Sequence, residues 1–157
     1  HTNSAPETIV RLLDMDIDPF NFADALLGIC AQRLVRTLCG ACKEAYAPPA
    51  EEFAELVREY GAEHWDKVGV AWSPELRLHR PKGCPKCGGS GYKGRMGIHE
   101  LLVASDEVKR MVQKRTPVEE LRQLAIREGM TTLLQDGILK VLRGNTDFKQ
   151  VRAVCIK

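Results

Sequence analysis

Four of the six cysteines form two pairs in which two residues separate the partners. The pairs are Cys39 with Cys42 in CGAC, and Cys84 with Cys87 in CPKC. This spacing lets both thiolates of a pair bind one metal ion at roughly 2.3 Å, and two pairs complete a tetrahedral zinc site. Because four protein ligands leave no position for a catalytic water, the sequence predicts structural Zn²⁺ that contributes to folding.

The two pairs are far apart in the sequence, with 41 residues between Cys42 and Cys84. A compact zinc ribbon has roughly 15–20 residues there, so folded structure must bring the pairs together. Gly40, Pro85 and Gly88 favour the tight turns that such a site needs.

The same four thiols could instead form two disulfides, and iron is the alternative metal. Disulfides rank below zinc, because no secretory leader accompanies the cysteines, and iron ranks lower still. The remaining cysteines, Cys30 and Cys155, stand alone. We expect them to pack as small hydrophobic side chains, Cys30 on the apolar face of a helix.

Motifs for nucleotide chemistry are missing or misplaced in this sequence. It has no G-x-x-x-x-G-K-[ST] loop to cradle phosphates, so the chain alone is predicted not to hydrolyse ATP. Gly89, Gly91 and Gly94 spell G-x-G-x-x-G, but they follow a cysteine pair rather than a strand. His99 and Glu100 lack the second histidine of a metalloprotease helix.

The formal net charge is only +2, so any electrostatic argument must be local. From Arg77 to Arg95 six basic residues meet no acidic residue, a local excess of +6. A solvated face is the favoured interpretation. If the stretch binds a partner, we expect a protein rather than nucleic acid, because Tyr92 is its only aromatic residue.

Periodicity and cap signals predict mostly helices. Helices are expected from the Ser4–Glu7 capping box to residue 13, from Asp18-Pro19 to about Leu38, and over 53–60. Alternation predicts strands at 76–80 and 98–103. No apolar run is long enough to span a bilayer, so the chain is expected to be soluble.

The region after Ser105 is expected to hold three or four helices. Ser105 and a Thr116–Glu119 capping box mark helix starts, and Gly129 and Gly144 mark stops. The expected core residues are Leu121, Leu124, Leu134, Ile138 and Val141.

Two long strings resemble the traffic ATPases of type II secretion and type IV pilus assembly. They are QRLVRTLCGAC, over 32–42, and GCPKCGGSGYKGRMGIHELL, over 83–102. The opening HTNSA and the following RLLDMDIDPF belong to the same resemblance, which covers essentially the whole chain. It implies that this chain is the C-terminal part of a longer protein.

The resemblance also carries functional expectations. It implies a cytoplasmic homohexamer that is peripheral to the bacterial inner membrane and binds ATP and Mg²⁺ upstream of this chain. ATP hydrolysis would drive pilin or pseudopilin subunits out of the bilayer through platform proteins of the membrane. His1 would be the second histidine of the family's His box, near the γ-phosphate. Arg33 and Arg36, expected to be helix neighbours, are candidates for a subunit contact.

We therefore expect an α+β fold, mostly helical. Residues 1–38 are assigned to the C-terminal remnant of a RecA-like ATPase domain, 39–94 to a tetracysteine zinc-binding subdomain, and 95–157 to a strand and a C-terminal helical bundle. In this chain the expected work is structural zinc binding and protein docking. The alternatives are a DnaJ-like zinc chaperone module, because CPKCGGSG resembles its repeat, and a zinc-ribbon nucleic-acid binder.

Overall fold

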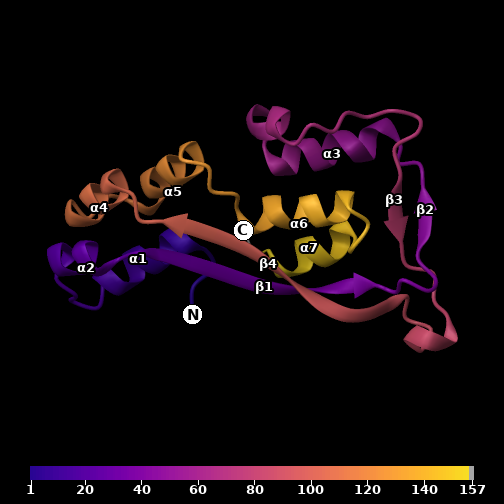
Figure 1. Cartoon of the computed structure of the whole chain (residues 1–157), viewed down its shortest axis with the longest axis horizontal. Coiled ribbons are helices and arrows are strands. Elements are labelled where there is room, and N and C mark those ends of the chain that lie inside the picture. Colours follow the sequence, from indigo (N-terminus) through magenta and orange to yellow (C-terminus); the bar gives the residue numbers. More distant parts are fainter. Residues whose placement is uncertain (156–157) are drawn as a thin grey trace. The chain divides into compact units, whose positions relative to one another are not determined.

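A computed structural model describes residues 1–155 as an α+β fold in which helices predominate, as predicted (Figure 1). The α-helices are α1 (Ala5–Leu13), α2 (Pro19–Ala25), α3 (Ala50–Tyr60), α4 (Asp106–Gln113), α5 (Val118–Arg127), α6 (Leu133–Leu142) and α7 (Phe148–Val154). The 3₁₀ helices are η1 (Ala62–Lys67) and η2 (Pro85–Cys87). Within residues 1–155, no helix combines the length and the apolar character that a membrane crossing requires.

The strands form two small sheets. They are β1 (Gly28–Leu38), β2 (Glu44–Tyr46), β3 (Leu78–Arg80) and β4 (Tyr92–Val103). β1 pairs with β4, and β2 pairs with β3 in antiparallel register, with Ala45 opposite His79. The strands predicted at 76–80 and 98–103 therefore exist as β3 and as the end of β4.

The helix predicted from residue 18 to about Leu38 is wrong over its second half. α2 ends at Ala25, and β1 begins at Gly28. Burial alternates in β1, with Val35 buried between exposed neighbours, which is the pattern of a strand with one covered face. The apolar spacing fitted a helix as well, and pairing with β4 decided the outcome.

The chain divides into two compact units. Unit 1 holds His1–Gln32 and His99–Leu133, and unit 2 holds Arg33–Ile98 and the described residues from Leu134 onward. The unit boundaries fall inside β1, β4 and α6. They differ from the division into 1–38, 39–94 and 95–157, which stays a prediction about subdomains.

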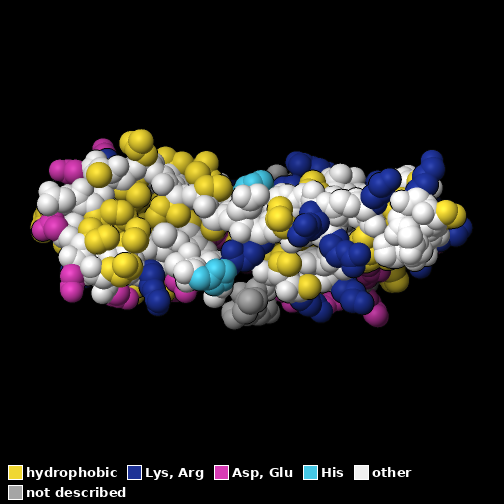
Figure 2. Space-filling view, turned by 90° about the horizontal axis from the view of Figure 1, so that it is seen from below, with side chains coloured by type: hydrophobic (Ala, Val, Ile, Leu, Met, Phe, Trp, Pro, Cys, Tyr) yellow, Lys and Arg dark blue, Asp and Glu magenta, His cyan; other side chains and the backbone are white. Residues whose placement is uncertain are grey.

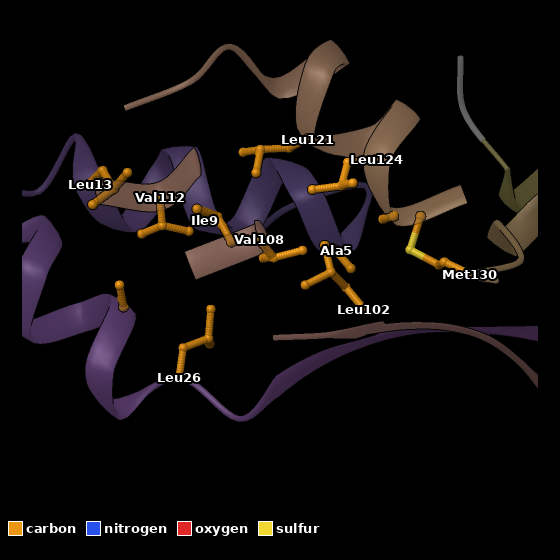
Figure 3. Packing of buried hydrophobic residues seen from close by; sticks show 12 residues of the cluster. Ala5, Ile9, Leu13, Leu26, Leu102, Val108, Val112, Leu121, Leu124 and Met130 are labelled. Carbon is orange, nitrogen blue, oxygen red and sulfur yellow. The ribbon is translucent and has the colours of Figure 1, made fainter. Parts of the chain in front are cut away.

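Unit 1 has one hydrophobic core, to which each of its helices contributes (Figure 3). α1 supplies Ile9 and Leu13, α4 supplies Val108 and Val112, and Leu102 comes from β4. α1 packs against α5, and α2 packs against α4. The predicted core residues Leu121 and Leu124 lie here, on α5.

Three of the four predicted helix caps that the structure tests in unit 1 are present. The Asp18 carboxylate accepts from the N–H groups of Phe20 and Asn21, both at 2.9 Å. The Ser4 hydroxyl accepts from the Glu7 N–H, and the Ser105 hydroxyl accepts from the Val108 N–H at 3.1 Å. The Thr116–Glu119 capping box is wrong, because Pro117 occupies the cap position and makes no side-chain cap bond. Glu119 instead accepts a hydrogen bond from Gln123, one turn further along α5.

Unit 2 packs α3, η1, α6 and α7 with the remaining strand segments. On α3, Phe53 and Tyr60 each meet the Trp65 ring edge to face, with centroids 5.5 and 5.2 Å apart. The predicted core residues Ile138 and Val141 are buried here, whereas Leu134 is half-buried. Gly129 and Gly144 follow the ends of α5 and α6 with positive φ, as their predicted role as stops requires.

Candidate metal centre

Each cysteine pair lies on a tight turn of unit 2. Cys39 follows β1 directly, and its carbonyl accepts from the N–H groups of Cys42 and Lys43 at 3.2 and 2.9 Å. In the second turn the Cys84 carbonyl accepts from the N–H of Cys87 at 3.2 Å. Both turns therefore point the two thiols of a pair to the same side.

Pairing of β2 with β3 closes the 41-residue gap between the turns. β2 begins two residues after Cys42, and β3 ends four residues before Cys84. Their antiparallel register places Glu44 opposite Arg80, so the two turns emerge from neighbouring strand ends. A backbone hydrogen bond of 2.8 Å from the Cys39 N–H to the Gly91 carbonyl joins them directly.

Two glycines allow the second turn to fold this closely. Gly91 has φ +81°, and a Cβ there would lie 2.5 Å from the Cβ of Pro81. Gly83 has φ +107°, and its Cβ would lie 2.6 Å from the carbonyl oxygen of Gly89. No other residue type meets both requirements, the positive φ and the missing Cβ. Gly91, the middle glycine of the G-x-G-x-x-G string, thus serves chain reversal beside the cysteines.

The four sulfur atoms lie at the corners of a compact cluster. Sγ of Cys39 is 3.9 Å from Sγ of Cys84, and Sγ of Cys42 is 3.9 Å from Sγ of Cys87. Cys84 and Cys87 are 3.8 Å apart at Sγ, and all four sulfurs lie within 4.8 Å of one another. A tetrahedron with arms of roughly 2.3 Å has edges of about 3.8 Å, so the spacing fits four thiolates around one zinc-sized ion.

The same distances are too long for disulfides in this arrangement. A disulfide needs sulfurs about 2.05 Å apart, and all six cysteines are free thiols in the structure. Cys39 is buried and the other three are half-buried. A closed, four-sulfur set of this kind can hold a soft or borderline metal ion and offers no open coordination position.

Backbone N–H groups are aimed at two of the sulfurs. Gly83 donates to Sγ of Cys42 at 3.4 Å, and Cys84 and Gly91 both donate to Sγ of Cys87 at 3.2 Å. Such bonds stabilise thiolates. Sequence reasoning missed these donors, because nothing in the residue types of Gly83 or Gly91 reveals where a backbone N–H points.

The thiols differ in their readiness to ionise. Desolvation raises the pKa of Cys42 to about 11, despite the Gly83 N–H. Desolvation also opposes ionisation of Cys87, but the N–H groups of Cys84 and Gly91 lower its pKa to about 6. Of these two thiols Cys87 therefore ionises more readily, and a bound cation would favour the thiolate form of Cys42.

The other residues singled out from the sequence are placed differently from the cysteines. His1 is exposed, and its role near a nucleotide stays a prediction. Arg33 and Arg36 are not helix neighbours, because they lie on β1, where residues three apart point to opposite faces; Arg33 is half-buried and Arg36 exposed. Cys30 is exposed on the same strand, so its predicted burial on a helix is wrong.

Comparisons with known proteins give one consistent family. The model of the type II/IV secretion system protein family matches residues 1–153. The type IV pilus assembly ATPase PilB of Thermus thermophilus is 40% identical over 157 residues, which is the whole of this chain and 16% of the relative. The type II secretion system protein E of Pseudomonas aeruginosa is 40% identical over 98% of this chain and 28% of the relative.

A third relative, the type II secretion system ATPase E of Vibrio cholerae, is 39% identical over 98% of this chain and 28% of its own length. The chain thus spans about a sixth to a quarter or slightly more of the curated relatives that it matches. These matches favour the secretion family over the chaperone module and the nucleic-acid binder.

Proposed function

Because the chain belongs to the type II/IV secretion system protein family, we propose that it is the C-terminal part of a hexameric cytoplasmic ATPase that powers type II secretion or type IV pilus assembly. The observation that carries this proposal is identity of about 40% across the whole chain to proteins named for these two machines. The chain lacks a phosphate-binding loop, so ATP and Mg²⁺ would bind to the remainder of the longer protein.

The division of labour follows from what this chain holds. Residues 1–38 would complete a RecA-like ATPase domain, with His1 at the nucleotide. The four cysteines would hold one structural Zn²⁺, since the set of four thiols at tetrahedral spacing suits it. The zinc-binding subdomain and the C-terminal helices would then dock platform proteins at the inner membrane, and the isolated chain would be inactive.

A chimera tests the proposal. The segment of Thermus thermophilus PilB that matches this chain is replaced by the 157 residues of this chain. The purified chimera is assayed for ATP hydrolysis, and its mass is measured by light scattering. We expect a hexamer that hydrolyses ATP within about tenfold of the parent, because the aligned segments are 40% identical.

The matched control carries the same chimera with Cys39→Ser and Cys42→Ser. We expect it to lose zinc and to assemble poorly, because the turns are no longer clamped. A chimera that folds and binds zinc but neither assembles nor hydrolyses ATP would contradict the assignment of this chain to such a motor.

A further inference from the structure

Unit 2 carries a cluster of exposed basic side chains that the metal centre does not use. The six basic residues of the stretch from Arg77 to Arg95 are all exposed, and no acidic residue interrupts them. Lys and Arg side chains gather on the face of this unit that Figure 2 shows. Such an excess on one surface repels itself and favours a partner of opposite charge.

Half of these cations already have partners within the unit. Arg77 donates to the carbonyls of Pro74 and Leu76, the guanidinium of Arg80 lies 4.3 Å from the centre of the Tyr46 ring, and Lys82 forms an ion pair of 3.2 Å with Glu44. These contacts account for the three residues before the second cysteine turn.

The other three, Lys86, Lys93 and Arg95, have no carboxylate within 4.0 Å among residues 1–155. Arg36 is not counted with them. Its guanidinium lies 4.7 Å from the centre of the Tyr92 ring, and neighbours on a strand, such as Tyr92 and Lys93, point to opposite faces. We name Lys86, Lys93 and Arg95 the basic face.

The backbone under the basic face is held in place. The Thr37 hydroxyl donates to the Lys93 carbonyl, and a Cβ on Gly94 would lie 3.2 Å from that hydroxyl oxygen. The Tyr92 hydroxyl donates to Asp147, which fixes the ring under Arg36. Binding to charges held in this way costs less conformational entropy than binding to charges on a loose loop.

The surroundings of the basic face indicate the chemistry of its partner. None of the large exposed hydrophobic side chains of the described chain lies between residues 77 and 95, so there is no apolar anchor to insert into a membrane. Tyr92, the sole aromatic residue of the stretch, is engaged by Arg36 and Asp147, so nucleic-acid bases lack a ring to stack on. Carboxylates pair well with guanidinium and ammonium groups.

We propose that the basic face, Lys86, Lys93 and Arg95, docks an aspartate- and glutamate-rich segment of a protein partner. The inference rests on the proposed docking role of this region and adds the surface and the chemistry. Because the contact is made by exposed charges, it would be salt-sensitive and would govern the rate and orientation of docking more than its final strength.

The test uses the zinc-loaded chain and a fluorescein-labelled oligoglutamate peptide, with binding followed by fluorescence anisotropy at low and at physiological ionic strength. We expect binding that weakens as salt rises. The triple variant Lys86→Gln, Lys93→Gln and Arg95→Gln should bind roughly tenfold more weakly, the combined effect of three exposed charge pairs.

The matched control removes the same number of exposed cations from unit 1, by Arg11→Gln, Lys114→Gln and Arg127→Gln. It should bind the peptide within about twofold of the parent. Equal loss in both variants, or no binding at low salt, overturns the proposal. Tighter binding of an oligonucleotide or of phosphatidylglycerol vesicles through the same three residues overturns it as well. The peptide assay measures binding and not ATP hydrolysis. A failure of this docking proposal can therefore be told apart from a failure of the chimera to assemble and hydrolyse ATP.

Discussion

The carboxylate of Glu100 accepts a hydrogen bond of 2.7 Å from the backbone N–H of Ala5, although 95 residues separate them in the chain. Its second oxygen accepts from the N–H of Leu133 at 3.1 Å. Ala5 and Leu133 are the first residues of α1 and α6, where N–H groups have no partner within the helix. One buried carboxylate, 3% exposed, thus satisfies two helix starts.

Glu100→Gln should destabilise the protein by about 2 kcal/mol. The amide keeps one acceptor oxygen but turns an NH₂ group toward an N–H donor, leaving a buried group unsatisfied. The control is Glu120→Gln, an exposed carboxylate at the start of α5, which should change the free energy of unfolding by less than about 0.5 kcal/mol. Urea unfolding measures both changes. Equal losses of unfolding free energy in the two variants would refute the role of Glu100 in joining the two helix starts.

Gly137 of α6 packs directly against Val151 of α7. In an open helix Gly→Ala stabilises by roughly 1 kcal/mol, but a Cβ on Gly137 would lie 2.4 Å from Cγ1 of Val151. The clash should win, because overpacking a filled core costs roughly 1–3 kcal/mol. We therefore expect Gly137→Ala to lower the free energy of unfolding.

A double-mutant cycle isolates this contact. Val151 is fully buried, so Val151→Ala alone also destabilises by leaving a cavity. In the double variant the new methyl group occupies part of that cavity, and the loss should be smaller than the sum of the two single losses. Strict additivity in thermal and urea unfolding would show that the two positions do not touch.

The four-cysteine cluster was predictable from the sequence because metal-binding chemistry requires a local spacing of the cysteines. Two residues between the cysteines of a pair bring their thiols to the same side, and this local effect does not depend on how the remaining chain folds. The Cys39–Gly91 backbone bond and the β2–β3 register, which assemble the two halves, were not predictable, because they join residues far apart in the chain.

The segment after Asp18 shows the opposite case. Phe22, Leu26, Ile29, Cys30 and Leu34 fit a helix, and only the distant β4 makes residues 28–38 a strand. Short apolar segments often fit both periods, and non-local pairing then decides. The sequence analysis also missed the structural role of Glu100. This role depends on the positions of Ala5 and Leu133, the first residues of their helices, whose N–H groups donate to its carboxylate.

Native mass spectrometry should find one zinc ion per folded chain. Removal of the ion by a chelator should unfold elements of unit 2, which would reduce the circular dichroism signal of the chain and lower its melting temperature. Cys84→Ser should abolish stoichiometric binding, because three thiolates and a hydroxyl hold zinc less well. Cys30→Ser is the control, since Cys30 lies outside the cluster. No metal together with two disulfides would contradict the centre.

Stability should fall as the pH drops below about 6.5, in part because of His79. Burial lowers the pKa of His79 from 6.5, and the positive charge of Lys43 lowers it further. Its Nδ1 is buried without a hydrogen-bond partner among residues 1–155, and a Cβ on Gly144 would lie 2.6 Å from it. The folded protein therefore resists protonation of this ring.

The sign follows from linkage. Above pH 6.5 the ring is neutral in the folded and the unfolded chain, and its contribution is constant. Below that pH the unfolded chain takes up a proton that the folded chain does not, so the free energy of unfolding falls, by at most about 1.4 kcal/mol per pH unit. His79→Asn should remove this part of the pH dependence.

Urea unfolding of the zinc-loaded chain at several pH values between about 7.5 and about 5.5 measures the effect, within the range around the ordinary pKa of histidine. The difference between the parent and His79→Asn should grow in favour of the variant as the pH falls. Lys43→Met should show a smaller pH-dependent loss than the parent, because burial alone then opposes protonation. The same pH profile for the parent and His79→Asn would mean that His79 takes up its proton as easily in the folded chain as in the unfolded one.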